Sequence, residues 1–158
     1  MKKILVTALL LGCSAPVLAD FQCNSNLKNR VIDDNIKVTK SCGLDQVSVK
    51  GNVMLERGAT LTMMNSRVEG NLESKGRFQQ VTASGNTIDG NIQLKEGVAA
   101  DLKNNHVDGN IELEKNTGKL VVQSNSVDGN LVCKENRSQP TGGQNRVYGD
   151  KEEQCRAL

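Results

Sequence analysis

A motif of the form Val/Ile-x-Gly-Asn recurs at almost constant intervals along most of this 158-residue chain. Five copies are complete and a sixth ends in Gly-Asp, so that six glycines mark the repeat: Gly51, Gly70, Gly90, Gly109, Gly129 and Gly149. The steps between these glycines are 19, 20, 19, 20 and 20 residues. A degenerate copy of the motif at residues 32–38 lies 17 residues before the first complete one. A period this regular is typical of a solenoid, in which each repeat forms one coil that stacks on the next.

Within each repeat, hydrophobic residues alternate with polar ones, as in β-strands that bury one face. One alternating segment surrounds the motif glycine and a second lies seven to nine residues before it. The amphipathic runs of a helical repeat and the Leu and Asn spacing of a leucine-rich repeat are both missing from the sequence. We therefore predict an all-β fold, a single-stranded parallel β-helix (β-solenoid) of about seven coils with a 19–20 residue period and two strand segments per coil.

The first 19 residues have the pattern of a secretory signal peptide. Lys2 and Lys3 precede the apolar run 4–11, and small residues at 17–19 favour cleavage before residue 20. The apolar run is too short to cross a bilayer as a helix. An alternative is a lipoprotein anchored through Cys13, which follows Leu-Leu-Gly. We expect an exported protein that is periplasmic or secreted.

Four cysteines follow the signal peptide: Cys23, Cys42, Cys133 and Cys155. Their spacing is too wide for zinc ligand pairs, and an even number in an exported chain predicts two disulfides. Because 19 residues make one coil, Cys23 and Cys42 should lie one above the other, and the separation of 22 between Cys133 and Cys155 is one coil with a longer loop. Bridges between these partners would close an N-terminal cap coil (20–45) and a C-terminal cap (133–158) around regular repeats (46–132).

Several polar positions of the repeat should form columns when the coils stack. The asparagines after the motif glycine could hydrogen-bond along the rod as a structural ladder, with a polar binding stripe as the alternative: Asn52, Asn71, Asn91, Asn110 and Asn130. The asparagines four residues before the glycine are typical of turns: Asn86, Asn105, Asn125 and Asn145.

The position immediately before the motif glycine carries four carboxylates that would repel one another when stacked: Glu69, Asp89, Asp108 and Asp128. Nearby lysines could offset this repulsion, for example Lys75, Lys95 and Lys134, or the aspartates could bond to their own turns. A third possibility is a divalent cation bound by adjacent carboxylates. The sequence decides neither for nor against such a metal site.

The C-terminal region carries a further pattern: Gly-Asn-Leu-x-Cys at 129–133, Pro140, Gly-Gly at 142–143, Asn-x-Val-x-Gly at 145–149, and Gln154-Cys155. In this region of 27 residues the chain resembles small exported bacterial right-handed parallel β-helix proteins with Val-x-Gly-Asn repeats and a Cys/Gly-Gly/Gln-Cys C-terminal cap. The resemblance implies a capped β-helix and no particular activity, because the group has none assigned. Tyr148 and Asp150 depart from the small or amide residues that are usual there.

For the function, we expect a non-catalytic structural or interaction module of the bacterial envelope that presents a flat sheet face to a protein or glycan partner. One alternative is a β-helix that binds or cleaves polysaccharide through Asp89, Asp108 and Asp128. Another is a subunit that polymerises when a cap opens. Catalysis is disfavoured because no long insertion interrupts the period to build a cleft, and His106 is expected to be an exposed side chain.

Charge and composition restrict the partners further. Without residues 1–19 the chain has 18 basic and 18 acidic residues, a balance that argues against nucleic-acid binding. With no Trp, one Tyr and two Phe, it has few aromatic rings to stack on sugars or to fill a sandwich core. We expect a monomer without cofactor and without a transmembrane segment.

Overall fold

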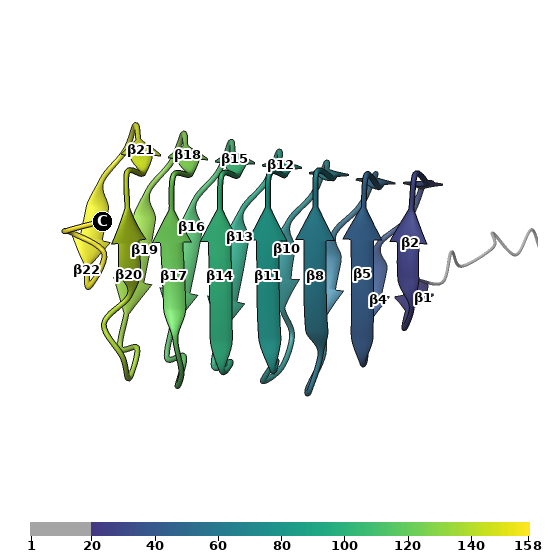
Figure 1. Cartoon of the computed structure of the whole chain (residues 1–158), viewed down its shortest axis with the longest axis horizontal. Helices are drawn as coiled ribbons and strands as arrows, with labels where there is room; N and C mark the ends of the chain where they lie inside the picture. The colour runs from purple at the N-terminus through teal and green to yellow at the C-terminus, as the bar shows by residue number, and fades with distance from the viewer. Residues whose placement is uncertain (1–19) are drawn as a thin grey trace, which may run out of the picture.

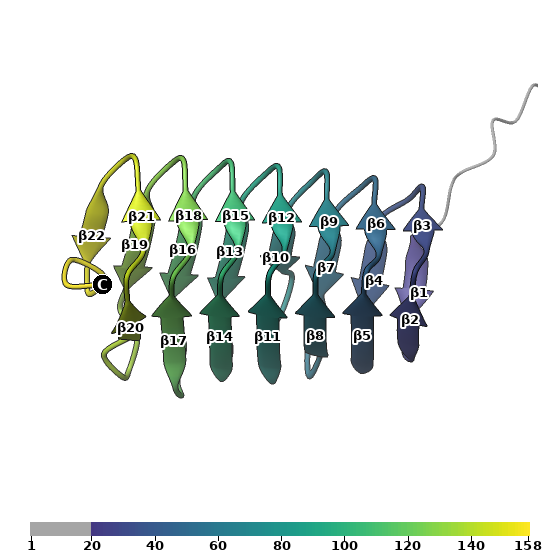
Figure 2. The same ribbon diagram turned by 45° about the horizontal axis from the view of Figure 1, so that its top comes forward.

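The computed structural model describes residues 20–158, so that the predicted signal peptide and the alternative lipid anchor at Cys13 lie outside the described residues. Residues 20–158 form a rod of about seven coils built from strands and turns (Figures 1 and 2). The strands of successive coils pair in parallel, which confirms the predicted parallel β-solenoid. Within this part of the chain, no helical segment has the length and apolarity needed to span a bilayer.

Three parallel sheets run along the rod and meet at three corners. Sheet A contains β1 (Phe21–Cys23), β4 (Ile36–Val38), β7 (Val53–Leu55), β10 (Leu72–Ser74), β13 (Ile92–Lys95), β16 (Ile111–Glu114), β19 (Leu131–Lys134) and β22 (Lys151–Glu153). Sheet B contains β2 (Asn26–Lys28), β5 (Ser41–Asp45), β8 (Thr60–Met64), β11 (Gln80–Ser84), β14 (Ala99–Lys103), β17 (Leu120–Gln123) and β20 (Thr141–Gly143). Sheet C contains the shortest strands: β3 (Val31–Ile32), β6 (Ser48–Val49), β9 (Arg67–Val68), β12 (Thr87–Ile88), β15 (His106–Val107), β18 (Ser126–Val127) and β21 (Arg146–Val147).

Each regular coil therefore has three strands, and the prediction of two segments per coil is wrong. The chain turns at the motif glycine, which separates a short strand of sheet C from the following strand of sheet A. The turn is hidden in the sequence because inward residues continue at period two across it. A Cβ at Gly90 would lie 2.5 Å from Asn71 Oδ1 and 2.7 Å from the carbonyl oxygen of Gly70 in the preceding coil. Glycine is required there because stacking brings that asparagine against it.

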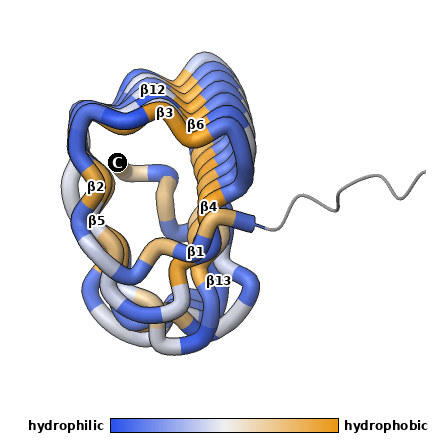
Figure 3. Tube along the Cα trace, turned by 90° about the vertical axis from the view of Figure 1, so that its right-hand side faces the viewer, coloured by the Kyte–Doolittle hydropathy of each residue, from blue (hydrophilic) through white to orange (hydrophobic). Residues whose placement is uncertain are grey.

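The interior of the rod is filled by buried, mostly aliphatic side chains. Figure 3 shows the hydrophobic residues of successive coils following one another along the rod. In the coil around Gly90, the inward residues are Ile88 from sheet C, Ile92 and Leu94 from sheet A, and Ala100 and Leu102 from sheet B, all of them buried. Burial of each larger aliphatic side chain contributes about 1.5–3 kcal/mol before the entropy of ordering the chain is subtracted. A single coil has only a few such side chains, so the rod is stabilised by stacking.

Both predicted disulfides are present, one at each end of the rod. The Cα atoms are 5.5 Å apart in Cys23–Cys42 and 5.1 Å apart in Cys133–Cys155. The spacing predicts that Cys23 and Cys42 lie one above the other, and this is wrong. The residue in register with Cys23 in the next coil is Val38. Each bridge instead links a strand of sheet A to the segment that follows the next strand of sheet A. Cys23 of β1 is bonded to Cys42 of β5, which follows β4, and Cys133 of β19 is bonded to Cys155, which follows β22. Two buried disulfides indicate an oxidising environment for the folded protein.

Candidate functional site

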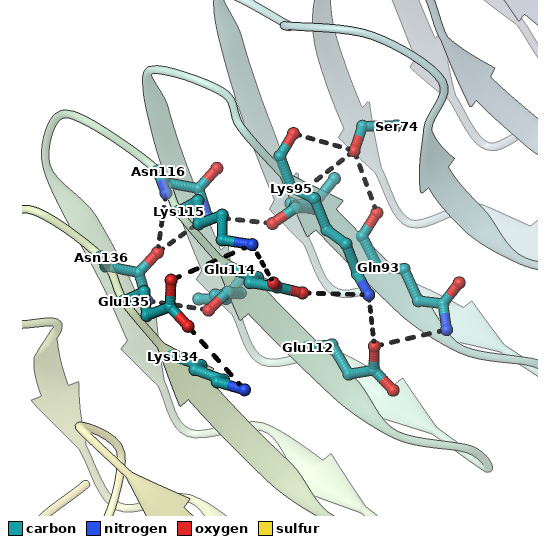
Figure 4. A network of polar contacts seen from close by, with 12 residues as sticks. Ser74, Gln93, Lys95, Glu112, Glu114, Lys115, Asn116, Lys134, Glu135 and Asn136 are labelled. Atoms are coloured by element: carbon teal, nitrogen blue, oxygen red, sulfur yellow. Dashed lines mark hydrogen bonds and ion pairs between the residues drawn. The ribbon is translucent and has the colours of Figure 1, made fainter.

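The outer face of sheet A is covered by charges that neutralise one another (Figure 4). Lys95 Nζ lies 3.2 Å from a carboxylate oxygen of Glu112 and 3.3 Å from one of Glu114, and Lys115 Nζ lies 3.0 Å from Glu114. The hydrogen bond with Glu112 raises the pKa of Lys95, and hydrogen bonds from Lys115 and then Lys95 lower the pKa of Glu114. This face therefore satisfies its own charges.

The same network corrects one expectation about the acidic column. Lys75 pairs with Glu73, Lys95 with Glu112 and Glu114, and Lys134 with Glu135. These lysines belong to sheet A or to the corner that follows it, whereas the acidic column lies on sheet C. The predicted interleaving of these three lysines with the four carboxylates is therefore wrong, because the two sets occupy different faces.

The asparagines of the motif lie in one column at the corner between sheets C and A. The backbone N–H and the Nδ2 group of Asn71 both donate to Asn52 Oδ1, at 2.8 and 3.0 Å. Asn91 bonds in the same way to Asn71, and Asn110 to Asn91, while Asn130 donates its backbone N–H to Asn110. These side chains are partly buried, and their amides are engaged along the rod.

Two further amide columns occupy the other corners, and their asparagines are more deeply buried than those of the motif. At the corner between sheets B and C, each asparagine accepts from the residue in the preceding coil and donates to a backbone carbonyl: Asn86, Asn105, Asn125 and Asn145. At the corner between sheets A and B, a shorter column consists of Asn116, Asn136 and Gln154. The sequence does carry a signal for the first of these columns, since its asparagines stand at a fixed place relative to the motif glycine.

The four carboxylates lie in one column on the outer face of sheet C, each directly after a short strand. The first three have a basic partner on the same face: Lys50 lies 2.5 Å from Glu69, Arg67 2.6 Å from Asp89, and His106 3.2 Å from Asp108. Lys50 stands in the column itself, and Arg67 and His106 stand two residues before a carboxylate. Repulsion between neighbouring carboxylates is thus offset at Glu69 and Asp89, whereas no lysine or arginine pairs with Asp108 or Asp128 within residues 20–158.

The C-terminal half of this column brings together three groups that could bind a metal ion. One ligand atom each from His106, Asp108 and Asp128 lies within 4.8 Å of the other two, and all three side chains are exposed. A shallow hollow beside them is lined by His106, Ser126, Asp128 and Tyr148. The guanidinium of Arg146 stacks 4.7 Å from the centre of the Tyr148 ring.

Sheet B presents the third face, which is flat and carries small side chains. Its strands are the longest in the rod, and the outward residues along its middle column are Asn26, Gly43, Thr62, Thr82, Asp101, Val121 and Thr141. Two ion pairs at 2.9 Å neutralise most of its charge, between Lys28 and Asp45 and between Lys103 and Asp101. A hollow of about 440 Å³ lies on this face beside Gly43, Thr62 and Met64, and Met64 is 42% exposed.

A comparison with known protein families, with curated proteins and with solved structures found no match for this chain. Sheet A is a charged surface whose ion pairs neutralise one another, and sheet C carries the acidic column. Sheet B carries mostly short polar side chains, with two ion pairs and the apolar Met64 and Val121.

Proposed function

We propose that this protein is a non-catalytic interaction module of the bacterial envelope, which binds an extended partner along the outer face of sheet B. The observation that carries the proposal is the contrast between the faces. On sheet A, long charged side chains are held in ion pairs that a partner would have to break. Sheet B has fewer ion pairs, and its two shallow hollows are lined by apolar side chains together with short polar ones, so that a partner can approach the strands closely.

The side chains of sheet B favour a glycan over a protein as the partner. Thr60, Thr62, Gln80, Thr82 and Ser84 offer hydroxyl and amide groups that can hydrogen-bond to sugar hydroxyls. Protein interfaces are instead centred on Trp, Tyr and Arg, and the outward positions of sheet B contain none of these. Since aromatic rings that could stack on sugars are missing from these positions as well, the glycan would be bound through hydrogen bonds. The exposed Met64 and the outward-facing Val121 are the features of this face that suit a protein partner.

The signal peptide pattern and the disulfides together support an extracytoplasmic location of the protein. A chain that is exported and oxidised would work in the periplasm or outside the cell. The C-terminal pattern groups it with small exported β-helix proteins whose last coil is closed by a disulfide.

A charged, bulky residue in the middle of sheet B tests the binding face. Thr82→Arg should reduce binding to an array of envelope glycans, including peptidoglycan fragments, at least tenfold. The matched control is Gln93→Arg, which places the same group on the outer face of sheet A and should leave binding unchanged. Loss of binding in the control alone, or no retention of the unmodified protein by any glycan, would contradict the proposal of a glycan-binding sheet B.

The non-catalytic character is tested separately. Incubation of the protein with the same glycans should release no reducing ends. If reducing ends appear, and if Asp89→Asn, Asp108→Asn or Asp128→Asn abolishes their release without loss of folding, the alternative of a polysaccharide-cleaving enzyme is correct.

A further inference from the structure

Stacking of two coils places the only histidine of the chain beside two aspartates. His106 lies in β15 and Asp108 follows it two residues later, so both side chains point outward from sheet C. Asp128 comes from the next coil, where it stands in the same register because Val107 pairs with Val127. The trio therefore depends on the fold and is not a local motif.

The spacing of the three groups is close to that of ligands around one transition-metal ion. Zinc binds histidine nitrogen at about 2.0–2.1 Å and carboxylate oxygen at about 2.0–2.2 Å, which places two ligands of a tetrahedral site about 3.4 Å apart. His106 Nε2 and Asp108 Oδ1 are already 3.2 Å apart. The remaining separations are at most 4.8 Å, and rotation of exposed side chains can close them.

The surrounding charges set this trio apart from the rest of the acidic column. Glu69 and Asp89 are each held by a lysine or an arginine, which would compete with a cation. Within residues 20–158, no lysine or arginine nitrogen lies within 4.0 Å of the carboxylates of Asp108 or Asp128. The small side chain of Ser126, next to His106 in register, leaves room for water molecules to complete the coordination.

We propose that His106, Asp108 and Asp128 form a binding site for one divalent transition-metal ion such as Zn²⁺, Ni²⁺ or Cu²⁺. The donor set of one imidazole and two carboxylates selects this class of metal, because Ca²⁺ and Mg²⁺ prefer oxygen ligands alone. The three protein ligands come from adjacent coils, so a bound ion would link two turns of the rod. The site lies on sheet C and is independent of the proposed binding face on sheet B.

Calorimetric titration tests this site on untagged protein with both disulfides formed. Zinc chloride should bind with one equivalent per chain and a micromolar dissociation constant, while calcium chloride at the same concentration should give no comparable heat. His106→Ala and Asp128→Asn should each weaken zinc binding at least tenfold. The control is Asp33→Asn, which removes the same charge from an exposed position in the first coil and should leave the affinity unchanged.

A second measurement locates the ion without any substitution. Substoichiometric copper(II) should broaden the imidazole resonances of His106 and the backbone amide resonances around β15 and β18 first, because paramagnetic relaxation acts over short distances. The inference is wrong if zinc gives no stoichiometric binding up to millimolar concentration. It is also wrong if His106→Ala and Asp128→Asn bind zinc as the unmodified protein does, or if copper broadens other regions first.

Discussion

Replacing Asn105 with alanine should lower the free energy of unfolding by about 3–5 kcal/mol, because its side chain is 2% exposed and connects three coils. Asn105 Nδ2 donates to the carbonyl oxygen of Ala83 at 2.9 Å and to Asn125 Oδ1 at 3.0 Å. Asn105 Oδ1 accepts from the backbone N–H of Asn86 at 3.1 Å and from its Nδ2 group at 2.9 Å. These four bonds hold one corner of the rod together.

The magnitude follows from the groups that alanine would leave behind. The backbone N–H of Asn86 would lose its acceptor inside the rod, and a buried unpaired donor costs about 1–3 kcal/mol. Two other groups that lose a bond to the Asn105 side chain keep another partner. Asn86 Nδ2 also donates to the carbonyl oxygen of Met63, and Asn125 Oδ1 also accepts from the backbone N–H of residue 105. Their lost bonds contribute about 0.5–1.5 kcal/mol each.

Two further variants make this prediction specific to burial. Asn110→Ala removes the same side chain from the partly buried motif column. It loses the Nδ2 bond to Asn91 and the bond accepted from the backbone N–H of Asn130, which water can replace there, and should cost only about 1 kcal/mol. Asn105→Ser should fall between the two, because Ser66 occupies the equivalent place in an earlier coil and accepts from the backbone N–H of Val47 at 3.0 Å. Urea denaturation followed by circular dichroism, with the disulfides intact, measures all three. Equal losses for Asn105→Ala and Asn110→Ala would refute the reasoning.

Three other predictions use the same denaturation assay. Gly90→Ala should lower the stability by about 2–4 kcal/mol, because its Cβ would lie 2.7 Å from a backbone carbonyl that cannot rotate away, and an unchanged midpoint would contradict this. Ser124 has a positive φ of 55°, so Ser124→Gly should raise the stability by about 1 kcal/mol, and a loss would show that its backbone is unstrained. The pKa of Glu114 is lowered by the adjacent lysine and then by one in the preceding coil, so its contribution is complete above the unfolded-state pKa near 4.5 and is lost as the pH falls through the folded-state value. At low salt, Glu114→Gln should therefore lose less stability on acidification than the unmodified protein does, and parallel acid curves would count against this ion pair.

Much of the fold can be predicted from the sequence because stacking repeats the same physical requirement in every coil. The motif glycine recurs since each one lies against the preceding asparagine. The spacing of the cysteines predicts the correct partners of both disulfides, although the two cysteines of a pair do not lie at equivalent positions of their coils. The division into three strands cannot be predicted in the same way. The two-residue strands of sheet C continue the alternation of sheet A across the glycine turn, so no break in the pattern marks their end.

The site is harder to predict because it depends on which residues of different coils share a face. His106 has no counterpart in the other repeats, and only the register of β15 and β18 brings it to Asp128. The asparagines before the motif resemble turn residues, although the left-handed residue of each turn is the one before them, for example Asn104 with φ 54°. Whether an amide at a corner points into the rod or toward solvent is decided by packing.

The stacking of residues 19 or 20 positions apart is tested most directly by nuclear Overhauser contacts in the oxidised protein. The structure predicts amide and Hα contacts of a parallel sheet between Ile92 and Ile111 and between Ile111 and Leu131, which pair in register in sheet A. It also predicts contacts between Thr82 and Asp101 in sheet B. Close Hα–Hα contacts between strands that follow each other in the chain, as in antiparallel hairpins, would contradict the solenoid.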